Sequence, residues 1–161
     1  MKKILFSLVL LISIASVQAQ NTAIEKATTA YLGVKDALVA GNAPLAKSHS
    51  KELLDALSVP AKGLTPAQQK LMVTYLPKLK YDSRHISETT VIVHQREHFA
   101  SLSKNMYSLL SGLKLNNATV YQQYCPMKKA YWLSETEDIR NPYYGDEMLE
   151  CGKVTATIKG K

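Results

Sequence analysis

The stretch SETTVIVHQREHFASLSKNMYSLLSGL, residues 87–113, carries the longest regular pattern in the chain. Seven of its side chains recur every three or four residues, the spacing that gathers side chains on one face of an α-helix. They are Val91, Gln95, His98, Leu102, Met106, Leu109 and Leu113. The pattern predicts one long helix over residues 87–113 and a mainly α fold.

Two shorter runs with apolar residues at the same helical spacing precede residues 87–113. Each such run is called a stripe. The first covers residues 22–40 and stops at Gly41 and Asn42, which favour the end of a helix. The second begins near Pro44, a residue suited to a first helical turn, and ends before Pro60. Each stripe predicts one amphipathic helix.

A third helix is expected to begin at Thr65. Thr65 and Gln68 have the spacing of a capping box, and Pro66 fits the first helical position. Pro77 should bend or end this helix, because proline lacks the N–H that a helix interior needs. His85 is then expected in a loop.

Four such helices joined by short polar loops predict a four-helix antiparallel up-and-down bundle, because short connections force successive helices to pack side by side. From about residue 115 the character changes. Residues 119–124 and 154–158 favour strands, and turn-forming residues lie between them. We therefore expect a mainly α fold with a small irregular β-containing C-terminal cap over residues 115–161.

The N-terminus has the three parts of a secretory signal peptide. Lys2 and Lys3 precede an apolar run over residues 4–14, and small residues lead to Ala19. The run is shorter than the roughly 20 apolar residues that span a bilayer. The sequence thus predicts a signal peptide at 1–19 and a single periplasmic helical domain at 20–161, with no transmembrane span in the mature form.

Composition excludes several function classes. The formal net charge is +7, but the lysines are scattered among acids along the helices, which argues against a nucleic-acid partner. The chain contains no phosphate-binding Gly-rich loop, no hydrolase nucleophile elbow and no HExxH zinc-protease motif. We expect a protein that is not an enzyme.

The two cysteines each have a methionine close by, in Cys125-Pro126-Met127 and in Met148-Leu149-Glu150-Cys151. Alternation along a strand places the first pair on one face, and three-residue spacing in a helical turn does the same for the second. Thiolates and thioethers together select soft ions, above all Cu(I). The two clusters are candidates for one four-sulfur pocket.

A disulfide is the simpler interpretation of two cysteines in an exported protein. A bond between Cys125 and Cys151 would stabilise the fold by ~3.5 kcal/mol in the chain-entropy model. From the residues alone the disulfide is somewhat favoured over a metal site. His94 and His98 lie one helical turn apart and can share an ion, although a core histidine is the commoner outcome for His98.

Several motifs of the second half resemble one protein family: Gln95-Arg96-Glu97-His98-Phe99, Tyr124-Cys125-Pro126-Met127, Trp132-Leu133-Ser134, Ile139-Arg140-Asn141-Pro142-Tyr143-Tyr144-Gly145 and Met148-Leu149-Glu150-Cys151-Gly152. The chain resembles domain of unknown function family three-three-four-seven. Proteins of that family are periplasmic helical domains, found alone or attached to heavy-metal efflux adaptors of the CusB kind.

The resemblance implies a candidate ligand set, since the family pattern retains these positions: His98, Cys125, Met127, Met148 and Cys151. With it comes the expectation of a periplasmic carrier or buffer for a soft metal ion, Cu(I) first, working with an efflux adaptor. The alternative is a structural or interaction domain in which a Cys125–Cys151 disulfide pins the tail and the helices dock a membrane-complex partner.

Overall fold

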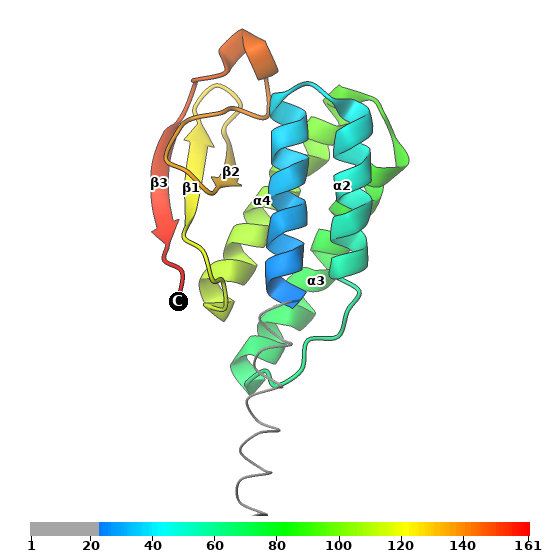
Figure 1. Cartoon of the computed structure of the whole chain (residues 1–161), viewed down its shortest axis with the longest axis vertical. Helices are drawn as coiled ribbons and strands as arrows, with labels where there is room; N and C mark the ends of the chain where they lie inside the picture. Colours follow the sequence, from blue (N-terminus) through cyan, green and yellow to red (C-terminus); the bar gives the residue numbers. More distant parts are fainter. Residues whose placement is uncertain (1–22) are drawn as a thin grey trace, which may run out of the picture.

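The computed structural model describes residues 23–161. An N-terminal helix occupies residues 23–39, followed by α2 (Ala43–Ala56), α3 (Pro66–Glu88) and α4 (Ile92–Leu113). The four helices lie side by side in a bundle (Figure 1). The predicted mainly α bundle is therefore confirmed. The predicted signal peptide lies outside the described residues.

The start of α3 follows its capping signals. The Thr65 hydroxyl accepts a hydrogen bond from the Gln68 N–H, and the Gln68 side chain accepts one from the Thr65 N–H. Of the two outcomes predicted at Pro77, a bend or an end of the helix, the end does not occur, because Pro77 lies in the interior of a helix that continues to Glu88. Leu79 and Ile86, beyond the proline, are fully buried. Their burial outweighs the single backbone hydrogen bond that proline removes.

The boundary between α3 and α4 also lies later than the sequence pattern indicates. The predicted long helix over residues 87–113 is interrupted, because α3 ends at Glu88 and α4 begins at Ile92. Thr89 is extended, and its hydroxyl accepts the Val91 N–H. β-branched residues favour such extended conformations. The buried Gln95 amide then donates to the Thr89 carbonyl, which fixes the connection between the helices.

The C-terminal part is more regular than the predicted irregular cap. It forms a three-stranded antiparallel sheet in the order β2-β1-β3, made of β1 (Val120–Cys125), β2 (Ala130–Ser134) and β3 (Lys153–Ile158). The short 3-10 helix η1 (Gly145–Met148) lies between β2 and β3. The sheet lies along one side of the bundle, beside the N-terminal helix and α4 (Figure 1).

A buried tyrosine joins the sheet to the helices. The Tyr31 hydroxyl accepts the Leu133 backbone N–H at 3.0 Å and shares a hydrogen bond of 2.7 Å with the Ser103 hydroxyl. The Tyr31 ring stacks on Phe99 of α4, with ring centroids 5.3 Å apart. Trp132 of β2 is fully buried in the same core. The sheet and the bundle therefore share one hydrophobic core.

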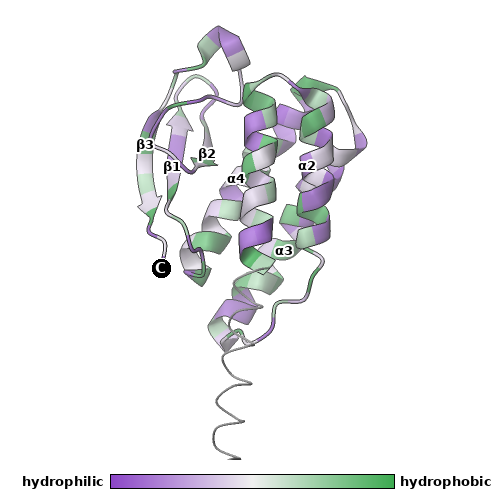
Figure 2. Ribbon diagram, in the orientation of Figure 1, coloured by the Kyte–Doolittle hydropathy of each residue, from purple (hydrophilic) through white to green (hydrophobic). Residues whose placement is uncertain are grey.

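No helix among residues 23–161 is both long enough and apolar enough to cross a membrane. Figure 2 shows hydrophilic and hydrophobic residues mixed along each helix of the bundle. This mixture is the amphipathic pattern that the sequence stripes predict.

Candidate metal centre

The two cysteines are brought together by the register of the sheet. In the antiparallel pairing of β1 with β3, Tyr124 lies opposite Lys153. Cys125 follows Tyr124 along β1, and Cys151 lies two residues before Lys153. Because antiparallel strands run in opposite directions, the end of β1 meets the chain just ahead of β3. The sequence pattern alone contains no information on this pairing.

The two sulfur atoms are 3.9 Å apart. Two sulfurs held by one ion at about 2.3 Å each lie at most about 4.6 Å apart, so the observed separation suits a shared metal ion. A disulfide needs the sulfurs to approach to about 2.05 Å. Both cysteines are free thiols in the structure. The geometry therefore accommodates an ion directly and a disulfide after a small movement.

The two thiols differ in their surroundings. Cys125 is fully buried, and its sulfur accepts the Lys128 backbone N–H at 3.4 Å. Cys151 is partly exposed. Partial desolvation, followed by the neighbouring Cys125 thiol, raises the pKa of Cys151, and the Met127 backbone N–H opposes this rise. Because the pKa is raised, a metal ion must displace a proton from this thiol at neutral pH.

The two methionines lie close to the cysteines along the chain. Met127 is in the turn after β1 and is 62% exposed, while Met148 ends η1 and is 36% exposed. The Met148 carbonyl accepts the Cys151 N–H at 3.1 Å. Neither methionine belongs to the buried core. Both methionines are thus partly exposed and close in sequence to the two cysteines.

Asn141, from the Ile-Arg-Asn-Pro-Tyr-Tyr-Gly motif, holds the segment that carries Cys151. Its side-chain amide donates to the Cys151 carbonyl at 2.9 Å, and its side-chain oxygen accepts the Tyr143 N–H at 2.9 Å. On the other side of Cys151, a Cβ on Gly152 would lie 2.7 Å from the Trp132 ring. The backbone beside Cys151 can lie against Trp132 only because residue 152 is glycine.

His98 contacts residues other than the four sulfur-containing candidates. Its ring Nδ1 lies 3.0 Å from Asp82 Oδ1 of α3, and its ring packs against those of His85 and His94. The side of α4 that faces the tail is instead occupied by Arg96, whose Nε donates to the Pro142 carbonyl at 2.9 Å. The five predicted ligands therefore divide into four tail residues and one histidine between α3 and α4.

The expectation that His85 lies in a loop is wrong. His85 is in the last turn of α3, because the helix continues past Pro77. Its ring lies parallel to the His98 ring at 4.5 Å between centroids. The pair His94 and His98 on one side of α4 was predictable from spacing, whereas the third histidine depended on the length of α3.

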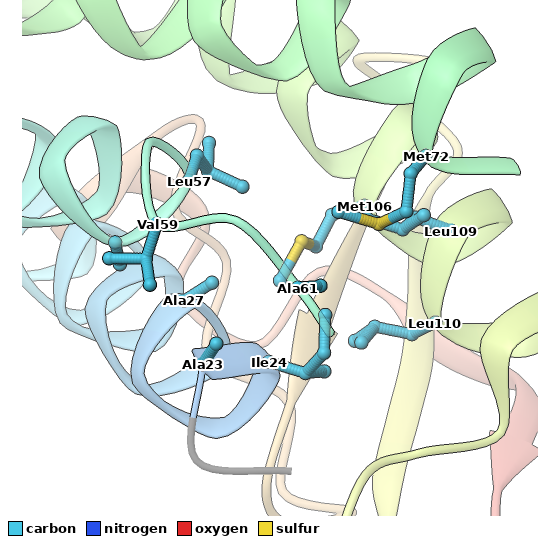
Figure 3. Close-up of a pocket in the computed structure, with 11 residues that line it drawn as sticks. Ala23, Ile24, Ala27, Leu57, Val59, Ala61, Met72, Met106, Leu109 and Leu110 are labelled. Atoms are coloured by element: carbon cyan, nitrogen blue, oxygen red, sulfur yellow. The ribbon is translucent and has the colours of Figure 1, made fainter. Parts of the chain in front are cut away.

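Two hollows formed by the described residues do not bring several metal-ligating side chains together. A small apolar cavity of about 10 Å³ lies between the N-terminal helix and the α3–α4 pair, with Met72 and Met106 among its lining residues (Figure 3). This volume is about that of one water probe. An open groove beside α2 contains His49, whose ring Nδ1 shares a hydrogen bond of 2.9 Å with the Glu52 carboxylate.

Together these features define a small helical-bundle protein whose C-terminal sheet carries a pair of neighbouring thiols, one buried and one partly exposed. The chain belongs to the family described as Protein of unknown function (DUF3347), which matches residues 27–118. The matched segment contains His98 and ends before β1 and both cysteines. No curated protein and no solved structure matches the chain.

Proposed function

We propose that the protein is a periplasmic carrier or buffer for a soft metal ion, Cu(I) first, which it passes to or receives from a heavy-metal efflux adaptor. The observation that carries this proposal is the 3.9 Å separation of the Cys125 and Cys151 sulfurs. Two thiolates suit Cu(I), and the surface thioethers of Met127 and Met148 are further soft ligands that need no deprotonation.

Binding is a ligand exchange that leaves oxidation states unchanged. Two thiols give up their protons to solvent, and the thiolate sulfurs of Cys125 and Cys151 bond to Cu(I), which loses its previous ligands. His98 lies with α3 and makes its hydrogen bond there. We therefore propose the four tail residues as the soft-metal ligands and leave His98 outside this set.

An anaerobic titration of the reduced protein with Cu(I), against a competing colorimetric chelator, tests the proposal. We expect one Cu(I) per chain in the wild-type protein and at least ~10-fold weaker binding after C125S/C151S. M127L and M148L should weaken binding less, and M72L on α3 is the matched methionine control that should leave it unchanged. Binding that C125S/C151S does not affect would refute the thiol site.

The same sulfur separation favours a second candidate function. In it, Cys125 and Cys151 form a disulfide that pins the tail, and the helical surface docks a membrane-complex partner. The dithiol would lose two electrons and two protons to a disulfide oxidant, which is reduced to two thiols. Mass measurement of freshly purified protein distinguishes the two: the loss of two hydrogens and no bound metal supports the disulfide.

A further inference from the structure

Three imidazole rings meet between the last turn of α3 and the first half of α4. His94 and His98 lie one turn apart on α4, and His85 reaches them from α3. One ring nitrogen from each residue lies within 4.8 Å of the others. All three residues are partly exposed. An ion from solvent can therefore reach the nitrogens.

The geometry points to a second metal site, formed by His85, His94 and His98, for a divalent first-row ion of the copper and zinc class. Imidazole nitrogen is a preferred ligand of both ions. Nitrogens bound to one ion at 2.0–2.1 Å lie roughly 3.3 Å apart in a tetrahedral site, so the rings need to close by about 1.5 Å or less. Rotation of the half-exposed His94 side chain can supply part of this movement.

Asp82 provides an independent reason to expect a ligand here. The Asp82 side chain is 5% exposed, and His98 is its hydrogen-bond partner among the described side chains. When His98 Nδ1–H donates to Asp82, the other ring nitrogen, Nε2, keeps its lone pair. A carboxylate that orients a histidine in this way is the usual support of a metal-bound imidazole.

The charges around the cluster favour a cation. An Asp82 carboxylate oxygen lies 3.0 Å from His98 Nδ1, and a Glu97 carboxylate oxygen lies 3.9 Å from His94 Nδ1. The Tyr81 ring packs on His85 at 4.4 Å between centroids and forms an aromatic wall. Three protein ligands leave a fourth position of a tetrahedral ion open to water or a small ligand.

This site does not rest on the sulfur proposal. It uses other residues and other elements, and it takes borderline divalent ions where the thiol pair takes Cu(I). The stability order of divalent complexes predicts tighter binding of Cu²⁺ than of Zn²⁺. Hard ions such as Mg²⁺, which prefer oxygen ligands, should not compete.

Titration of the full chain carrying C125S/C151S with Zn²⁺ and with Cu²⁺, by calorimetry, tests the site without interference from the sulfurs. We expect one ion per chain, and at least ~10-fold weaker binding after H85Q, H94Q or H98Q. H49Q is the matched control, because His49 lies on α2 and is bonded to Glu52, and it should bind as the parent does.

The most telling variant is H94Q, because the His94 side chain is 45% exposed and its replacement should leave the fold intact. Circular dichroism and the thermal midpoint check this for every variant. Nitrogen hyperfine structure in the electron paramagnetic resonance spectrum of the Cu²⁺ form should appear in the parent and weaken in H94Q. The absence of 1:1 binding, or binding that H94Q leaves unchanged, would overturn the site.

Discussion

At the scale of single residues, three polar side chains join segments of the chain that lie apart in the sequence. Tyr31, Asn141 and Arg96 each bond backbone groups of a different segment. These hydrogen bonds span ten or more residues, and each is at least partly buried. Their loss should therefore cost more than an ordinary surface substitution.

Replacing Tyr31 with phenylalanine removes a hydroxyl but keeps the ring. The Leu133 N–H and the Ser103 hydroxyl would each lose a buried partner, so we expect the free energy of unfolding to fall by about 1–3 kcal/mol. Urea unfolding at neutral pH measures the change. S108A, at an exposed hydroxyl on α4, is the control and should change stability by less than about 0.5 kcal/mol.

Tyr31 also predicts how stability depends on alkaline pH. Burial raises its pKa well above the ordinary value of 10.0, so the folded state keeps the phenolic proton where the unfolded chain has lost it. The contribution of the protonated Tyr31 to the free energy of unfolding is complete below pH 10. It is lost as the pH rises toward the folded-state pKa. Stability should fall more steeply above pH 10 in the wild type than in Y31F. Parallel pH profiles of the two proteins would contradict this.

Asn141 allows the support of the thiol pair to be tested apart from the thiols. In N141A the Cys151 carbonyl and the Tyr143 N–H lose their partners. We expect a loss of about 1–3 kcal/mol in unfolding free energy and weaker Cu(I) binding, because the Cys151 segment is no longer fixed. Unchanged Cu(I) affinity in a folded N141A protein would show that the segment needs no such support.

At the scale of elements, α3 shows where the sequence pattern succeeds and where it does not. Its start was predictable, because the capping box of Thr65 and Gln68 is a local signal. Its end was not, because burial of Leu79 and Ile86 against other helices carries the chain past Pro77. The same long-range packing places His85 on a helix. Local patterns thus identified two histidines of the cluster and missed the third.

Pro77 should therefore destabilise α3. In P77A the residue regains an N–H that can donate to the carbonyl of Val73, four positions earlier, and a helix interior favours alanine over proline by about 3 kcal/mol. Part of this gain is offset because proline also restricts the unfolded chain, by about 0.4–1 kcal/mol. We expect P77A to raise the unfolding free energy by about 2–2.5 kcal/mol. A loss of stability would show that the helix needs the proline's local geometry.

At the scale of the whole molecule, the sheet register decides the candidate sulfur site. The motifs around Cys125 and Cys151 were visible in the sequence, but their distance was not, because it depends on β1 pairing with β3 across the loop that contains η1. The expectation that Cys125-Pro126-Met127 is extended is wrong, because β1 ends at Cys125 and Met127 lies in the turn that follows. β2 was not among the predicted strands. His98 lies on the face of α4 that packs against α3, whereas a ligand of the tail site would have to lie on the face toward the tail.

The redox state of the thiol pair should control both stability and metal binding. After equilibration with oxidised glutathione, a Cys125–Cys151 disulfide would close a long loop and raise the unfolding free energy by ~3.5 kcal/mol in the chain-entropy model. The same protein should lose its Cu(I) site, because both thiolates are consumed. Chemical unfolding and Cu(I) titration of the reduced and oxidised forms measure the two effects. Equal Cu(I) binding by both forms would contradict the thiolate ligands.

The most direct test of the central claim is X-ray absorption at the copper edge of the reduced protein loaded with one Cu(I) per chain. We predict sulfur scatterers in the first coordination shell, whose number falls in C125S/C151S, where only the thioethers remain, and is unchanged in H94Q. A first shell made only of nitrogen or oxygen in the wild-type protein would contradict the claim that the Cys125 and Cys151 thiolates hold the ion.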